Sequence, residues 1–179
     1  MNHFAKALLL IASTTVMPAT ALAGTAPESM CGKSDQVVFS CPLAGSTKTV
    51  SMCAAGDVAH GTGRFYYAYG RPAKPELTYP APGNEGEFTR THLTFAGNTG
   101  GYAYGFTNAG FKYIVYSISG SSNLQEGGLV VLKDDQATPV KHSACQAGNV
   151  TDTDEDALID ATLKWKSDPI IEKNGIPSP

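Results

Sequence analysis

The chain has few charged side chains and no strongly basic or acidic segment. Its 179 residues include 13 Lys and Arg against 16 Asp and Glu, a formal net charge of −3. A mildly acidic chain without a long run of like charges has little attraction for the phosphates of nucleic acids or for anionic lipids. After residue 23, no apolar run is long enough to cross a bilayer. The composition therefore argues against a nucleic-acid partner and predicts no integral membrane segment in the mature chain.

The first 23 residues have the composition of a secretory signal peptide. Lys6 gives a basic start, residues 7–16 form a short apolar run, and Ala21-Leu22-Ala23 has the small-x-small pattern that a signal peptidase recognises. We expect cleavage near Ala23 and a mature chain, residues 24–179, that is periplasmic or secreted. A chain of this length predicts a single β-rich domain with its own hydrophobic core.

Close groups of cysteine and histidine are missing, which argues against zinc. The four cysteines, Cys31, Cys41, Cys53 and Cys145, contain no C-x-x-C pair, so we expect no metal and no cofactor. In an oxidising compartment an even number of cysteines predicts two disulfides, for which three connectivities are possible. If residues 36–41 and 48–52 pair as a hairpin, Cys41 and Cys53 point to opposite faces of the sheet. This register favours Cys31–Cys53 and Cys41–Cys145.

Short β-branched and aromatic segments, separated by turn residues, make up most of the mature chain. The expected strands include residues 37–39, 49–52, 64–69, 76–79, 88–95, 102–106, 111–119, 129–132 and 140–145. Their close spacing, with 19 glycines and 11 prolines, predicts a mainly β fold. We expect an antiparallel meander in a sandwich or a flattened barrel. For residues 70–75, Pro72 and Pro75 exclude a tight primed turn and indicate an extended, rigid excursion.

The C-terminal region predicts one helix, at about residues 154–166. Residues 152–153 can cap it, and the acidic residues 154–156 suit a helix N-terminus. Its apolar side would consist of Leu158, Ile159, Leu163 and Trp165. Asp168-Pro169 is expected to end it.

Motifs for nucleophilic or metal-assisted catalysis are missing, because the chain has neither G-x-S-x-G nor H-E-x-x-H. We therefore assign no catalytic residue and favour binding over catalysis. An alternative is a periplasmic hydrolase of envelope polysaccharide that uses Glu76 or Glu87 with His60 or His92. This alternative requires such groups to meet in one deep cleft. A structural role in the envelope is a third alternative, with no feature specific to it.

The tyrosines suggest a recognition surface beside residues 70–75. Tyrosine is a good strand former, so most of the rings are explained by packing. Arg71 and Lys74, however, lie close in sequence to Tyr67 and Tyr69. Arginine and tyrosine are frequent anchors of protein interfaces. We expect Arg71 and Lys74 to contact an acidic protein partner in the cell envelope, and Tyr67 or Tyr69 to fill a pocket.

Several blocks of sequence carry a resemblance: V-F-S-C at residues 38–41, K-T-V-S-M-C-A at 48–54, Y-A-Y-G-R-P-A-K-P-E-L-T-Y-P at 67–80 and G-F-K-Y at 110–113. Over residues 31–145 the chain resembles a set of small exported proteobacterial proteins of uncharacterised activity. The resemblance implies an exported β-rich domain with paired cysteines and implies no activity. In size, compartment and class the chain is also similar to periplasmic lysozyme inhibitors, although their inhibitory loop motif is not matched. The resulting expectation is an exported soluble binding protein, such as an inhibitor or immunity-type partner of a wall-degrading enzyme or toxin.

Overall fold

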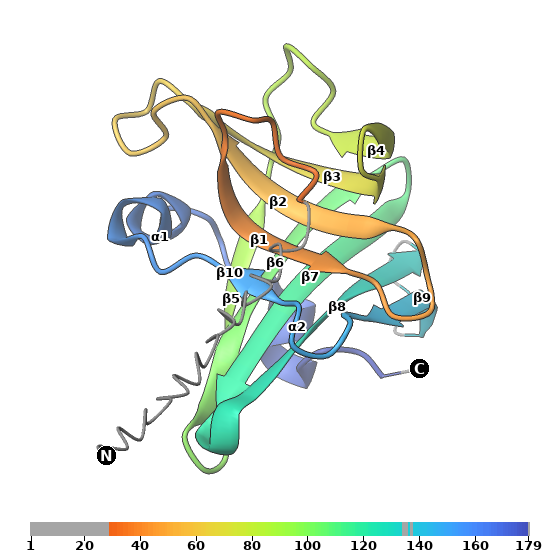
Figure 1. Cartoon of the computed structure of the whole chain (residues 1–179). Helices are drawn as coiled ribbons and strands as arrows, with labels where there is room; N and C mark the ends of the chain where they lie inside the picture. Colours follow the sequence, from red (N-terminus) through yellow and green to blue (C-terminus); the bar gives the residue numbers. More distant parts are fainter. Residues whose placement is uncertain (1–28, 134–135, 137, 179) are drawn as a thin grey trace, which may run out of the picture.

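Two antiparallel sheets stacked face to face form the body of the protein (Figure 1). The computed structural model describes residues 29–133, 136 and 138–178, so the signal peptide predicted at residues 1–23 lies outside the described residues. The first sheet has the order β10-β1-β2-β3-β4 and the second the order β5-β6-β7-β8-β9. Strands β1 to β4 and β5 to β9 pair in sequence order, as a meander requires, and β10 alone departs from this order by pairing with β1. The sheets remain separate, so the predicted mainly β fold is a sandwich and not a closed barrel.

The strands of the first sheet are β1 (Gln36–Pro42), β2 (Thr49–Ala55), β3 (Arg64–Arg71), β4 (Lys74–Tyr79) and β10 (Thr151–Asp152). Those of the second are β5 (Thr89–Phe95), β6 (Thr99–Asn108), β7 (Phe111–Gly120), β8 (Leu124–Lys133) and β9 (Pro139–Ala144). The β8 strand begins five residues before the predicted apolar run at 129–132, because β7 pairs along its whole length with β8. Ladder hydrogen bonds thus recruit polar and glycine residues that local propensity leaves out.

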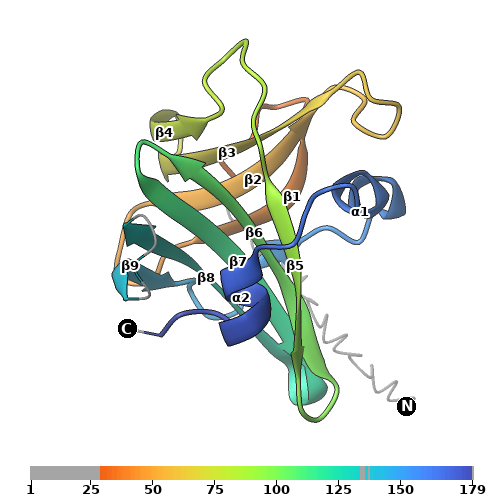
Figure 2. The same ribbon diagram turned by 180° about the vertical axis from the view of Figure 1, so that it is seen from behind.

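The main core lies between the sheets, where alternate residues of each strand point inward. On β6 and β7, Tyr104, Phe106 and Val115 face this core. Their neighbours Ala103 and Ile114 face outward instead, into a second apolar cluster. Part of this outer face of the second sheet is covered by α2 (Pro169–Asn174), as Figure 2 shows from behind.

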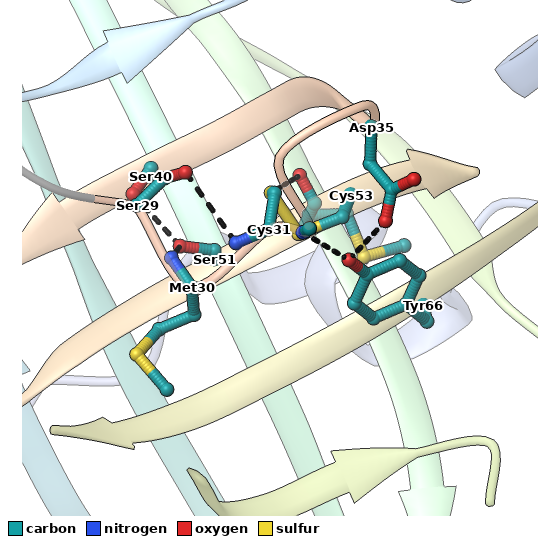
Figure 3. Close-up of a disulfide and its surroundings, with 10 residues drawn as sticks. Ser29, Met30, Cys31, Asp35, Ser40, Ser51, Cys53 and Tyr66 are labelled. Atoms are coloured by element: carbon teal, nitrogen blue, oxygen red, sulfur yellow. Dashed lines mark hydrogen bonds between the residues drawn. A yellow bond between two sulfur atoms is a disulfide. The ribbon is translucent and has the colours of Figure 1, made fainter. Parts of the chain in front are cut away.

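The structure pairs Cys31 with Cys53 and Cys41 with Cys145, with Cα–Cα distances of 5.5 and 5.6 Å. Cys41 lies in the core between the sheets, opposite Val50. Cys53 lies on the outer face, where Cys31 attaches the segment before β1 to the sheet (Figure 3). The hairpin places the two cysteines on opposite faces, which is the reason that the register favoured this pairing.

The connection at residues 70–75 differs from the expected extended excursion. Arg71 pairs with Lys74, so β3 and β4 are joined by a two-residue turn of Pro72 and Ala73. Pro72 suits the first turn position, and Ala73 adopts a positive φ of 61°. An irregularity in the ladder between Tyr69 and Gly70 accommodates the second proline. The two prolines exclude a primed turn, as predicted, but they are compatible with this tight unprimed turn.

The C-terminal region contains two short helices instead of one. The α1 helix (Asp156–Thr162) ends four residues before the predicted end, and Leu163 is exposed. Asp168-Pro169, predicted to end a helix, instead begins α2: Asp168 is the N-cap, accepting from the backbone N–H groups of Ile170 and Ile171, and Pro169 occupies the first turn. The same dipeptide suits both roles, since proline at N1 lacks only an N–H that the helix does not use.

No helix within the described residues is long and apolar enough to span a membrane. The described cysteines are all paired. Two disulfides suit an oxidising compartment outside the cytoplasm.

Candidate functional site

An apolar pocket opens between the sheets where β3 faces β7, β8 and β9, with a volume of about 250 Å³. We call it the Tyr69 pocket. Its walls include Tyr67, Tyr69, Phe111, Tyr113, Leu129 and Val131. Val140 and Lys141 of β9 complete its rim, and Val140 is 54% exposed. An exposed valine beside an apolar pocket marks a surface that can bury further apolar area.

Two lysines lie over the half-buried ring of Tyr69. The ammonium nitrogens of Lys48 and Lys141 lie 5.1 and 5.2 Å from the ring centroid, within the range of cation–π attraction. Lys141 Nζ also donates a hydrogen bond to the Tyr69 hydroxyl over 3.0 Å. Tyr69 is therefore held in place by β9 and by the residue preceding β2, and its ring is part of the pocket wall.

The carboxylate of Glu76 lies close to these lysines. Lys48 Nζ forms an ion pair with Glu76 over 2.7 Å. The hydrogen bond from Lys48 lowers the pKa of Glu76, and the positive charges of Arg71 and Lys141 lower it further. We define the basic rim as Lys48, Arg71, Lys74 and Lys141. Among the described residues, the positive charges of Lys48, Arg71 and Lys141 act on the Glu76 carboxylate, and Lys74 is exposed on the same turn as Arg71.

The four residues predicted to bind a partner occupy different environments. Arg71 and Lys74 are exposed on the β3–β4 turn, and Tyr69 is half-buried. Tyr67 is only 1% exposed, with its ring 4.8 Å from that of Phe106. Burial raises the pKa of the Tyr67 phenol well above its usual range. Tyr67 and Tyr69 thus line a pocket of this protein. The sequence had instead predicted that one of them fills a pocket in the partner.

Half of the basic rim was missed by sequence reasoning. Lys48 lies before β2 and Lys141 on β9, and neither is close in sequence to the residues that it contacts. No local motif marks them, since a lysine in an exposed strand is usually a solvated residue. Only the stacking of β9 against β3 brings Lys141 to Tyr69.

A larger cleft, of about 600 Å³, lies between the loop before β5 and the segment after α1. We call it the Trp165 cleft. Its aromatic wall consists of Tyr79, Phe88, Phe106 and Trp165. Its charged side chains are Glu85, Glu87, Lys112, Lys164, Lys166 and Asp168. None of the described histidines lines it.

The residues of the hydrolase alternative are dispersed. His60 Nδ1 lies 2.8 Å from Asp57 on an exposed loop, and the His92 ring lies 5.2 Å from the ring of Tyr102. Glu76 is paired with Lys48, while Glu87 lines the Trp165 cleft. Within the described chain, no hydrogen bond or ion pair joins either glutamate to either histidine. The described residues also contain no group of three or more His, Cys, Asp or Glu side chains placed to hold a metal ion.

Comparisons with protein-family models, curated proteins and solved structures find no match to this chain. The function is therefore inferred from the geometry and charge of these two hollows.

Proposed function

We propose that this chain is an exported binding protein that holds an acidic protein partner of the cell envelope against the Tyr69 pocket. The observation that carries the proposal is the combination, among the described residues, of an apolar pocket with the basic rim beside it. The signal peptide expected at residues 1–23 and the two disulfides support a site of action outside the cytoplasm.

The size of the pocket favours a side chain of a protein over a free small molecule. Small-molecule sites commonly have volumes of about 300–1,000 Å³. The Tyr69 pocket, at about 250 Å³, falls below that range. It has room for an apolar side chain that serves as an anchor, the arrangement typical of the few residues that supply most of the affinity of an interface.

The basic rim supplies selectivity for the partner. The basic rim would attract an acidic surface of the partner and raise the rate at which this surface meets the pocket. Because rim charges remain hydrated, they contribute more to association rate and specificity than to final affinity. We infer that the partner presents an apolar side chain flanked by Asp or Glu. A wall-degrading enzyme or an incoming toxin is the class of partner that we propose.

Two observations favour binding over hydrolysis. The Lys48 hydrogen bond lowers the pKa of Glu76, whereas a general acid needs a raised pKa. Glu87 lies in a cleft that neither His60 nor His92 lines, so the expected pair of acid and histidine is not assembled there.

Photo-crosslinking in the cell envelope tests the proposal. A benzophenone side chain introduced at Val140 is at the edge of the Tyr69 pocket and should capture the partner. Reversing two rim charges, with Arg71→Glu and Lys74→Glu together, should lower the yield roughly tenfold by removing electrostatic attraction. Tyr69→Ala should also lower it, by opening the pocket wall.

The matched control reverses two exposed lysines elsewhere, with Lys33→Glu and Lys173→Glu. It makes the same change in net charge and should leave the yield unchanged. Equal loss with both double variants would show that only overall charge matters. Unchanged capture in the Arg71/Lys74 variant would contradict the proposed surface.

A further inference from the structure

The Trp165 cleft is a second hollow, independent of the Tyr69 pocket, and its volume of about 600 Å³ lies within the range of small-molecule sites. We propose that it binds a small zwitterionic molecule with a flat ring. Three features carry this inference: a rigid aromatic wall, two walls of opposite charge, and the absence of ion pairs between those walls.

The aromatic wall is a continuous array of packed rings. Tyr79 stacks on Phe106 at a centroid distance of 4.2 Å and an interplanar angle of 11°. Phe88 lies 5.1 Å from Trp165 at 29°. Phe88 and Phe106 are almost fully buried, while Tyr79 and Trp165 remain half-exposed. A ligand ring can therefore extend this array by packing against Tyr79 or Trp165.

Both sides of the cleft are held in place before any ligand arrives. On one side, the backbone N–H of Glu87 donates to the Tyr79 hydroxyl over 3.2 Å. On the other side, the carbonyl oxygen of Lys166 accepts from the backbone N–H of Arg90 over 3.0 Å. Walls that are already ordered lose little conformational entropy on binding.

The two sides carry opposite charges that do not neutralise each other. Glu85 and Glu87 are exposed on the loop before β5, and Lys164 and Lys166 are exposed after α1. Among the described residues, none of these four side chains takes part in an ion pair. A ligand with an ammonium and a carboxylate group could contact both sides, with each charge facing its opposite.

The buried ion pair of the cleft has a structural role instead. Lys112 Nζ lies 2.7 Å from Asp168 Oδ2, and the two side chains are only 17% and 6% exposed. Asp168 Oδ1 caps α2, so both carboxylate oxygens are already used. The ligand charges are therefore assigned to the exposed glutamates and lysines.

The chain contains a single tryptophan, Trp165, so its fluorescence reports directly on this cleft. The probes are phenylalanine, which has a ring and both charges, phenylalaninamide, which lacks the carboxylate, and hydrocinnamate, which lacks the ammonium group. We expect phenylalanine to change the Trp165 emission saturably at millimolar concentration. Each analogue with one charge should require roughly two- to fivefold more, the range expected for exposed charge pairs.

Two charge-removing variants should separate the probes. Glu87→Gln should weaken phenylalanine and phenylalaninamide but not hydrocinnamate, because it removes a partner of the ammonium group. Lys166→Gln should weaken phenylalanine and hydrocinnamate but not phenylalaninamide. Glu126→Gln and Lys33→Gln, at exposed positions outside the cleft, are the matched controls and should change nothing.

The proposal is overturned if none of the three probes changes the emission, or if all three act equally on the wild-type protein. A saturable response to N-acetylglucosamine with none to phenylalanine would also overturn it and would indicate an uncharged sugar ring. None of these outcomes bears on the Tyr69 pocket, which contains no tryptophan.

Discussion

Tyr66 and Tyr67 are neighbours on β3 but point to opposite faces of the sheet, and replacing each with phenylalanine should change stability in opposite directions. Tyr66 is on the outer face, 8% exposed. Its hydroxyl donates to Asp35 Oδ2 over 2.6 Å and accepts from the backbone N–H of Gly32 over 2.8 Å (Figure 3). Tyr67 is in the core, 1% exposed, and among the described residues its hydroxyl has no hydrogen-bond partner. Each substitution removes one oxygen and preserves the ring.

The magnitudes follow from these environments. A buried hydroxyl without a partner costs about 1–3 kcal/mol. Tyr67→Phe removes that cost and should raise the free energy of unfolding by about 1–2 kcal/mol. Tyr66→Phe removes two hydrogen bonds, one of them to a carboxylate, and should lower it by about 2–3 kcal/mol. For a chain of this size, 1 kcal/mol corresponds to a shift in Tm of about 2–4 °C.

Urea unfolding followed by circular dichroism measures both variants, with the wild-type protein alongside. The denaturant midpoint should rise for Tyr67→Phe and fall for Tyr66→Phe, with unchanged m-values. If Tyr67→Phe instead lost as much stability as Tyr66→Phe, its hydroxyl would have a partner, such as a buried water. That result would refute the assignment of Tyr67 to a dry core.

Three further predictions concern the bridges, alkaline pH and one glycine. By the chain-entropy relation, replacing Cys41 and Cys145, which are 104 residues apart, with alanine should lower the free energy of unfolding by about 4–5 kcal/mol. Replacing Cys31 and Cys53, which are 22 residues apart, should lower it by about 3 kcal/mol. Urea titration measures both losses, and equal losses would contradict this order. Burial raises the pKa of Tyr104 to about 12. Its neutral phenol therefore contributes about 2–3 kcal/mol to the free energy of unfolding, and this contribution is complete below pH ~10 and is lost as the pH rises toward 12. If the urea midpoint of Tyr104→Phe fell as steeply over this pH range as that of the wild-type protein, the ionisation of Tyr104 would be excluded as the cause. Gly70 has a φ of 148°, and a Cβ there would lie 2.7 Å from the backbone of the facing strand. Gly70→Ala should therefore lower the free energy of unfolding, measured by thermal unfolding, by about 3 kcal/mol. Gly45→Ala, where φ is 66° and the space is open, should cost only about 1 kcal/mol, and similar costs at the two sites would argue against the close approach.

The strands could be predicted from the sequence because their pattern is local. Alternating residues in β6 and β7 decide which side chains face the core, and the period of two also separates Cys41 from Cys53. The turn at Pro72 and Ala73 could not be predicted in the same way. Its geometry depends on a positive φ at Ala73, which the ladder between β3 and β4 imposes.

The end of α1 was also beyond local prediction. The apolar residues after α1 suggested that the helix continues, but Trp165 instead packs edge-on against Phe65 at a centroid distance of 4.7 Å. Packing this half-exposed ring against Phe65 and Phe88 outweighs the gain from one more helical turn.

By itself, the sequence determined the class of fold, the strands β1 to β9 and the faces to which the cysteines point, because hydrogen-bonded hairpins and side-chain alternation are local properties. The β10 strand was not predicted, because it is two residues long and pairs with the distant β1. Only the tertiary structure decided which side chains line the Tyr69 pocket and the Trp165 cleft. Lys141 meets Tyr69 across 72 residues, and Lys112 meets Asp168 across 56. Such contacts arise when the two sheets stack and the C-terminal segment packs against them, and no local pattern in the chain encodes which side chains then come together.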